Sequence, residues 1–129
     1  MPAYQNVTPP ISLSPGDVGF SFNNEAFPAA NTAGSQFAIP SYTGRADSGN
    51  AVRWQTIFGT APTAVSIVLQ VAMADVDAEY QTIDTTTALT GEARTIPSAA
   101  VPGNVQAKFL RIKVVSSTGG AGLTAKLLV

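Results

Sequence analysis

The sequence predicts an all-β domain: an antiparallel two-sheet sandwich, jelly-roll-like, with an extended Pro-rich N-terminal arm. Apolar and polar residues alternate with the period of a β-strand along most of the chain. Pro and Gly recur throughout, with 9 and 11 residues, whereas the helix-favouring residues Leu, Lys and Glu are sparse. A chain of 129 residues is the size of one domain. About seven or eight short strands between turn-rich loops fit such a sandwich.

The clearest predicted strand runs from Ala64 to Met73. Alternate residues in it are apolar and are expected on one buried face, opposite Ser66 and Gln70. These apolar residues are Val65, Ile67, Leu69, Val71 and Met73. We therefore expect a half-buried strand at the centre of a sheet.

Residues 107–129 are predicted to form a hairpin with a Gly-rich connection over 116–122. Its first strand is expected to turn Arg111 and Lys113 to solvent and to bury Leu110, Ile112 and Val114. Its second strand is expected to bury Leu123, Ala125, Leu127 and Val129. The last residue would then lie inside the fold.

Two further strands are predicted before the central one. In the first, Val18, Phe20 and Phe22 are expected to share a face. In the second, the inward set is Val52, Trp54, Thr56 and Phe58, and the outward set is Arg53, Gln55 and Ile57. Weaker strands are predicted around 36–39, 79–84 and 92–96.

Residues 1–16 differ in kind from the sandwich domain predicted over 17–129. Four prolines in this stretch disfavour central-strand pairing, yet several of its residues are too apolar for a solvating tail. Those residues are Tyr4, Val7, Ile11 and Leu13. We expect an arm that packs on a partner; a frayed terminus or an edge segment of the same domain is the alternative.

Composition excludes most catalytic chemistry. The chain has no His and no Cys, which removes the commonest general base, the thiol nucleophile and the usual zinc and copper ligands. The run Gly119–Gly122 lies between predicted strands and lacks the helix that a phosphate-binding loop requires. We therefore predict no enzymatic activity, no cofactor and no small-molecule substrate.

An acidic turn is the one candidate cation site. Asp75, Asp77 and Glu79 have the alternating spacing that can supply oxygen ligands to calcium. The glycine and the final glutamate of an EF-hand are missing, so a solvated turn is the favoured interpretation. Whether these three residues bind a cation is left open by the sequence.

The charge pattern suits a protein that faces other proteins. Charged residues make up 12% of the chain and the net charge is −1, which is sparse for a free monomer. Only Lys108, Arg111 and Lys113 cluster, so nucleic-acid binding is not predicted. With no signal-peptide pattern and no membrane-length apolar run, we expect synthesis in a host cytoplasm and no membrane partner.

From about residue 64 onward, the order of features resembles the C-terminal half of small jelly-roll domains in virion proteins of tailed bacteriophages. The matching segments are the alternating strand 65–70, the acidic turn 75–77, the run 80–87, Gly91–Glu92, the strand 109–114 and the Gly-rich final turn. Discoidin-like sandwiches end with a similar aromatic-apolar-Arg-apolar strand. The residues before 64 match no family motif.

This resemblance implies a capsid decoration (cement) protein on the outer surface of a phage head. Such a protein would form a homo-trimer or dimer and bind the major capsid protein, with Tyr4, Val7, Ile11 and Leu13 of the arm as the contact segment. A tail, baseplate or fibre protein is an alternative. A carbohydrate-binding sandwich is another.

The carbohydrate-binding alternative depends on exposed aromatic rings that stack on sugars. Its candidates are Tyr42, Trp54 and Tyr80. Trp54 alternates with core residues, so core packing is its favoured role. Tyr42 and Tyr80 lie beside predicted turns and are the better exposed candidates.

Overall fold

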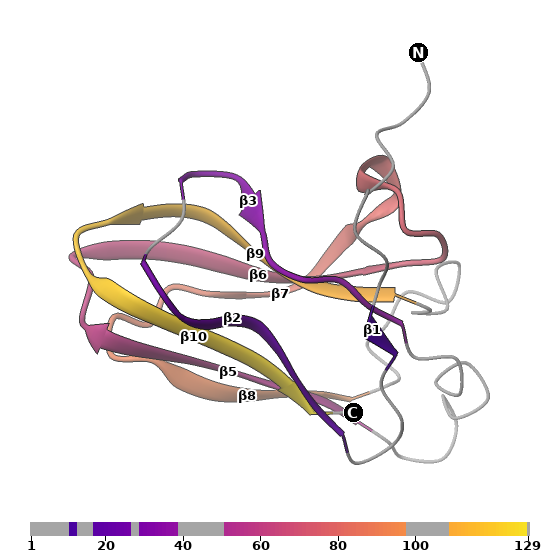
Figure 1. Cartoon of the computed structure of the whole chain (residues 1–129), viewed down its shortest axis with the longest axis horizontal. Coiled ribbons are helices and arrows are strands. Elements are labelled where there is room, and N and C mark those ends of the chain that lie inside the picture. The colour runs from indigo at the N-terminus through magenta and orange to yellow at the C-terminus, as the bar shows by residue number, and fades with distance from the viewer. Residues whose placement is uncertain (1–10, 13–16, 27–28, 39–50, 98–108, 129) are drawn as a thin grey trace.

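Two β-sheets pack face to face in the computed structural model, which describes residues 11–12, 17–26, 29–38, 51–97 and 109–128 (Figure 1). The six-stranded sheet contains β1 (Ile11–Ser12), β3 (Thr32–Ala33), β4 (Phe37–Ala38), β6 (Ala64–Ala72), β7 (Gln81–Thr86) and β9 (Phe109–Thr118). The four-stranded sheet contains β2 (Val18–Glu25), β5 (Ala51–Thr60), β8 (Glu92–Pro97) and β10 (Ala121–Leu128). A short 3-10 helix, η2 (Asp77–Glu79), precedes β7.

The strand order is that of a jelly roll. The four-stranded sheet runs β2-β10-β5-β8, and the other runs β1-β4-β9-β6-β7 with β3 also paired to β9. Every pair is antiparallel except β1 with β4. The predicted all-β, two-sheet, jelly-roll-like sandwich is confirmed, and the strands expected around 18–22, 52–58, 64–73, 79–84 and 92–96 are all present.

The core lies between the sheets and is built from the inward half of each alternating strand. Its buried members are Phe22, Phe37, Trp54, Val65, Ile67, Leu69, Val71, Ile96, Leu110, Ile112, Val114, Leu123, Ala125 and Leu127. Met73 was expected among them, but β6 ends at Ala72, and the Met73 side chain is exposed. The alternation therefore predicts burial correctly only as far as the strand itself extends.

The predicted C-terminal hairpin is wrong in its pairing. β9 pairs with β6, β3 and β4, whereas β10 pairs with β2 and β5 in the other sheet. Both strands carry a fully buried apolar face, and the turn at Gly119 and Gly120, with φ of 69° and 82°, carries the chain across the core. The two apolar faces therefore meet across the sandwich instead of lying side by side. Val129 lies outside the described residues.

A charged cluster closes one side of the sandwich. Asp84 on β7 accepts hydrogen bonds from Trp54 Nε1 on β5 at 2.8 Å and from Arg94 Nε and Nη2 on β8 at 2.5 and 2.9 Å. Arg94 also bonds Glu92, whose carboxylate accepts the Thr86 hydroxyl proton. Burial by itself raises the pKa of Asp84, but the hydrogen bonds from Arg94 and Trp54 outweigh it and hold the pKa below its ordinary value. Side chains of β7 are thereby joined to β5 and β8 of the opposite sheet.

On the opposite side of the sandwich, hydrogen bonds between Ser21 on β2 and Ser35 join the two sheets. Ser35 N donates to Ser21 O, and Ser21 Oγ donates to Ser35 O, both at 3.3 Å. A Cβ on Gly34 would lie 2.5 Å from Ser21 O, so this approach requires glycine. Glycine is likewise required at Gly91, before β8, where φ is 85° and a Cβ would lie 2.4 Å from Thr56 O.

Only a small part of the predicted arm is described. Ile11 and Ser12 form β1, which pairs in parallel with β4, and Ile11 N donates to Gln36 O at 2.9 Å. These two residues therefore form an edge segment of the six-stranded sheet. Among the described residues, no helix has the length and hydropathy needed to cross a bilayer.

Candidate interaction surface

The outward-facing side chains of the four-stranded sheet form two rows that cross β2, β10, β5 and β8. Strand register fixes them, because residues opposite one another on neighbouring strands point to the same face. The first row is Phe20, Lys126, Gln55 and Ala93, and the second row is Val18, Leu128, Arg53 and Thr95. Together with Ile57 on β5, these residues are called here the outer face.

Phe20 reaches the outer face because of a β-bulge in β2. Ala125 pairs with Phe22 and Lys126 pairs with Phe20, so one step along β10 spans two along β2 and Ser21 is the extra residue. Phe22 is 5% exposed, whereas Phe20 is 44% exposed. The expectation that Val18, Phe20 and Phe22 share one face is therefore wrong: the bulge sends Phe22 into the core and leaves Val18 and Phe20 outside.

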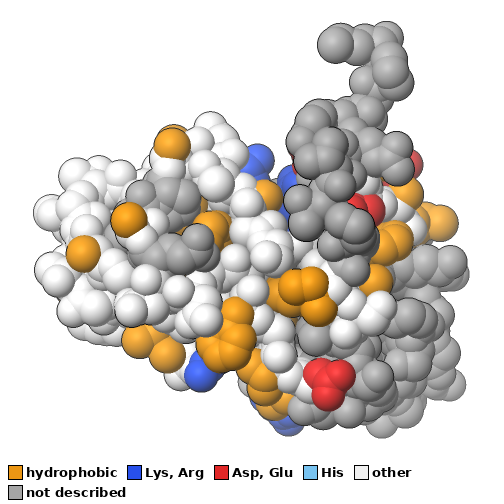
Figure 2. Space-filling model, in the orientation of Figure 1, with side chains coloured by type: hydrophobic (Ala, Val, Ile, Leu, Met, Phe, Trp, Pro, Cys, Tyr) orange, Lys and Arg blue, Asp and Glu red, His pale blue; other side chains and the backbone are white. Residues whose placement is uncertain are grey.

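Large hydrophobic side chains are exposed on the outer face. Val18, Phe20 and Ile57 are three of the six large exposed hydrophobic residues in the described part of the chain, and Leu128 is half-buried beside Val18. Figure 2 shows hydrophobic atoms next to Lys and Arg atoms along the lower part of the molecule, over β2 and β10, with a group of acidic atoms close by. Apolar side chains that gather on one face, rimmed by charge, are typical of a protein-binding surface.

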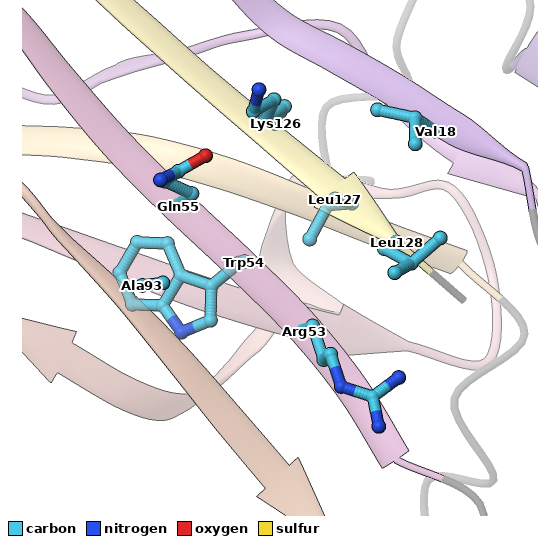
Figure 3. Close-up of a pocket in the computed structure, with 8 residues that line it drawn as sticks. All are labelled: Val18, Arg53, Trp54, Gln55, Ala93, Lys126, Leu127 and Leu128. Atoms are coloured by element: carbon cyan, nitrogen blue, oxygen red, sulfur yellow. The ribbon is translucent and has the colours of Figure 1, made fainter.

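A hollow of about 290 Å³ lies among the two rows (Figure 3). Its lining residues are Val18, Arg53, Trp54, Gln55, Ala93, Lys126, Leu127 and Leu128. The side chains of Trp54 and Leu127 belong to the buried core, whereas the other six lining residues are members of the two outward rows. The hollow therefore lies on the outer side of the sheet. The small side chain of Ala93 leaves space at the end of one row. This hollow is called here the groove.

The described charges of the outer face are cationic. Arg53 is exposed, and Lys126 Nζ lies over the Phe20 ring, 5.9 Å from its centroid. Neither cation belongs to an ion pair within the described part of the chain. Asp17, which precedes β2, is the acidic residue nearest in sequence to these rows, and the side chain of Glu25 is not described.

The acidic turn is part of a second cluster, on the outside of the six-stranded sheet. Arg111 is 4% exposed, donates to Gln70 Oε1 at 2.8 Å and to Asp77 Oδ1 at 2.5 Å, and lies 4.0 Å from the centroid of the Tyr80 ring. Tyr80 in turn donates to Asp75 Oδ1 at 2.7 Å. Burial, and then the hydrogen bond to Asp75, raises the pKa of the Tyr80 phenol.

This cluster corrects two expectations. Arg111 was expected on a solvated face, but the 73–80 segment folds over it and supplies the carboxylate and the ring that offset its burial. Asp75 and Asp77 were expected in a solvated turn, but both accept hydrogen bonds from buried partners. In the described ranges, no group of three acidic side chains is arranged to hold a metal ion.

The predicted site residues fall into three groups. Tyr4, Val7, Leu13 and Tyr42 lie outside the described residues. Ile11, in β1, is 51% exposed. Trp54 is 2% exposed, as its alternation predicts, and Tyr80 is 8% exposed although it lies beside a turn, because the turn packs it against Arg111. Neither buried ring offers a face to a sugar.

Comparisons with known proteins leave the function to be argued from this surface. No family model matches the sequence, and no curated protein matches it. Among solved structures, the SPBc2 prophage-derived protein YomS aligns with a TM-score of 0.48 at 15% identity, over 95% of this chain and 96% of that one. PirA aligns with a TM-score of 0.37 at 11% identity, over 88% and 83% of the two chains. Likenesses this distant carry no functional argument.

Proposed function

We propose that this chain is a structural virion protein of a tailed phage, a capsid decoration protein that binds the outer surface of the head through the outer face. The observation that carries the proposal is the exposed apolar set of Val18, Phe20 and Ile57 on the outer face. Burial of such side chains stabilises an association by about 25 cal/mol per Å², less the cost of immobilising the partners.

Other features support the same role. With 12% charged residues, the chain has little charge with which to keep a free monomer dispersed. Hydrogen bonds of Asp84 on one side of the sandwich and of Ser21 on the other join the two sheets. A binding face that is held in place before the partner arrives lowers the entropic cost of association. The role requires no catalytic group. The proposal also includes self-association into a trimer or dimer, with Tyr4, Val7, Ile11 and Leu13 as its contact segment.

The direct test is co-sedimentation with undecorated heads of the phage that encodes the chain. We expect saturable binding of the wild-type protein. We expect Phe20→Ser to weaken it roughly tenfold or more, because a central aromatic at an interface commonly contributes above 1.4 kcal/mol. Met73→Ser is the matched control, since Met73 is 50% exposed and directly follows β6 of the other sheet.

Two outcomes would contradict the proposal. Absence of binding to heads, with binding to purified tails instead, would place the chain in a tail, baseplate or fibre. Equal loss of binding in the Phe20 and Met73 variants would show that the outer face is not the contact. Circular dichroism on each variant separates loss of binding from loss of fold.

The carbohydrate-binding alternative gains no support from the described aromatics, because Trp54 and Tyr80 are both buried. Of its predicted platform residues only Tyr42 lies outside the described part of the chain. The outer face, by contrast, supplies a described surface for a protein partner, so the structural role is the one argued here.

A further inference from the structure

We propose that the groove accepts a segment of the partner protein in which an acidic side chain lies next to an apolar one. The inference rests on the proposed function and deepens it, because it names the chemistry of the partner at the same surface. It follows from which groups line the groove and from the sign of their charge.

The groove combines two kinds of contact. Val18 and Leu128 form an apolar side, and Ala93 leaves room for a side chain to enter. Arg53 and Lys126 both line the hollow, and Gln55 on β5 lies opposite Lys126 on β10 (Figure 3). An apolar side chain would occupy the hollow while a neighbouring carboxylate bonds Arg53 or Lys126, a charge-assisted contact of the kind Arg makes best.

The charges also decide between possible occupants. A second copy of this chain docked face to face would bring Arg53 and Lys126 of one copy close to the same cations of the other, and like charges at an interface are unfavourable. Within the described residues, the outward positions of the four strands carry no carboxylate to compensate. A partner segment that brings its own carboxylate supplies an anion to one of these cations and covers the apolar side.

The cations are available for such a contact. The other two arginines described on strands form ion pairs, Arg94 with Asp84 and Glu92 and Arg111 with Asp77. Among the described residues, no carboxylate forms an ion pair with Arg53 or Lys126, and Lys126 Nζ lies over the exposed Phe20 ring. Binding of an anion therefore breaks no described ion pair.

The test uses two capped peptides, acetyl-Gly-Leu-Glu-Leu-Gly-amide and its twin with Lys in place of Glu, titrated into the full ¹⁵N-labelled chain. We expect the acidic peptide to shift the backbone amides of Gln55, Lys126 and Leu128 saturably, and the basic twin to bind at least tenfold more weakly. Raising the salt from about 0.05 to 0.5 M should weaken the acidic peptide, because the Debye length falls well below 10 Å. Equal shifts with both peptides, or shifts that miss these three amides, would overturn the inference.

Charge-reversal variants test the same inference in the head-binding experiment. Lys126→Glu should weaken head binding by about tenfold, while Lys113→Glu, the same change on β9 of the other sheet, should leave it unchanged. If Phe20→Ser abolishes head binding and Lys126→Glu does not alter it, the groove inference fails and the proposed function stands. If the acidic peptide binds but the wild-type chain does not bind heads, the proposed function fails and the groove chemistry stands.

Discussion

At the scale of single residues, two buried threonines make opposite contributions. Thr56 and Thr86 are each 1% exposed, but the Thr56 hydroxyl finds no hydrogen-bond partner in the described structure, whereas Thr86 Oγ1 donates to Glu92 and accepts from Ala88 N. A buried hydroxyl without a partner costs stability, and a paired one does not.

We therefore expect the same substitution to have opposite signs at these two sites. Thr56→Val should raise the free energy of unfolding by about 1 kcal/mol, because it removes an unpaired polar atom at nearly constant volume. Thr86→Val should lower it by about 1–3 kcal/mol, because Glu92 and Ala88 N lose their partner. Urea unfolding followed by Trp54 fluorescence measures both, and a loss of stability in Thr56→Val would contradict the account.

Residue types alone predicted some side-chain positions and missed others. The period-two pattern placed Trp54 in the core, and the structure agrees at 2% exposure. The same pattern placed Arg111 in solvent and Phe20 on one face with Phe22, and both are wrong. The burial of Arg111 depends on the 73–80 segment folding back over the sheet, and the exposure of Phe20 depends on one bulged residue, Ser21. Neither event leaves a periodic signal in the sequence.

At the scale of elements, strand positions were predictable and strand partners were not. The positions follow from local alternation, which any sheet face imposes. Pairing depends on contacts between residues far apart in the chain. The alternation pattern of two consecutive apolar strands, such as β9 and β10, is therefore the same whether they pair as a hairpin or lie in opposite sheets. Packing decides for the crossing, because both faces are then buried against each other.

The link from β7 to β5 and β8 gives stability a defined pH dependence. Because the pKa of Asp84 is lower in the folded protein than its ordinary value near 4, its contribution is complete above that value and is lost as the pH falls through the folded pKa. Asp84→Asn should be less stable than wild type by about 1–3 kcal/mol at neutral pH, because hydrogen bonds to a charged group are lost. The two stabilities should begin to converge below about pH 4 and should meet only once the pH is below the folded pKa of Asp84.

Urea midpoints measured from neutral pH down to about pH 2 test this link. Glu79→Gln is the control, since Glu79 is exposed on η2 and belongs to no described ion pair. Its stability should track that of the wild type at every pH. A gap between wild type and Asp84→Asn that stays constant into acid would show that the Asp84 charge does not support the fold.

At the scale of the whole molecule, the outer faces of the two sheets differ in how far the chain itself covers them. The six-stranded sheet has part of its outer face covered by its own 73–80 segment, with Arg111 and Tyr80 buried beneath it. The four-stranded sheet leaves Val18, Phe20 and Ile57 exposed around a cationic groove. Low overall charge led us to expect a protein-facing surface, and the candidate proposed for it is defined by strand register and the bulge in β2, which the sequence pattern did not reveal.

The orientation of the bound chain is the most direct test of the central claim, that the outer face of the four-stranded sheet is the attachment surface. A three-dimensional reconstruction of heads saturated with the wild-type chain shows which face meets the capsid. We expect β2, β10 and β5 to lie against the capsid subunits, with Phe20 in the contact and the six-stranded sheet on the side away from the capsid. A chain bound with its outer face open to solvent would contradict the claim.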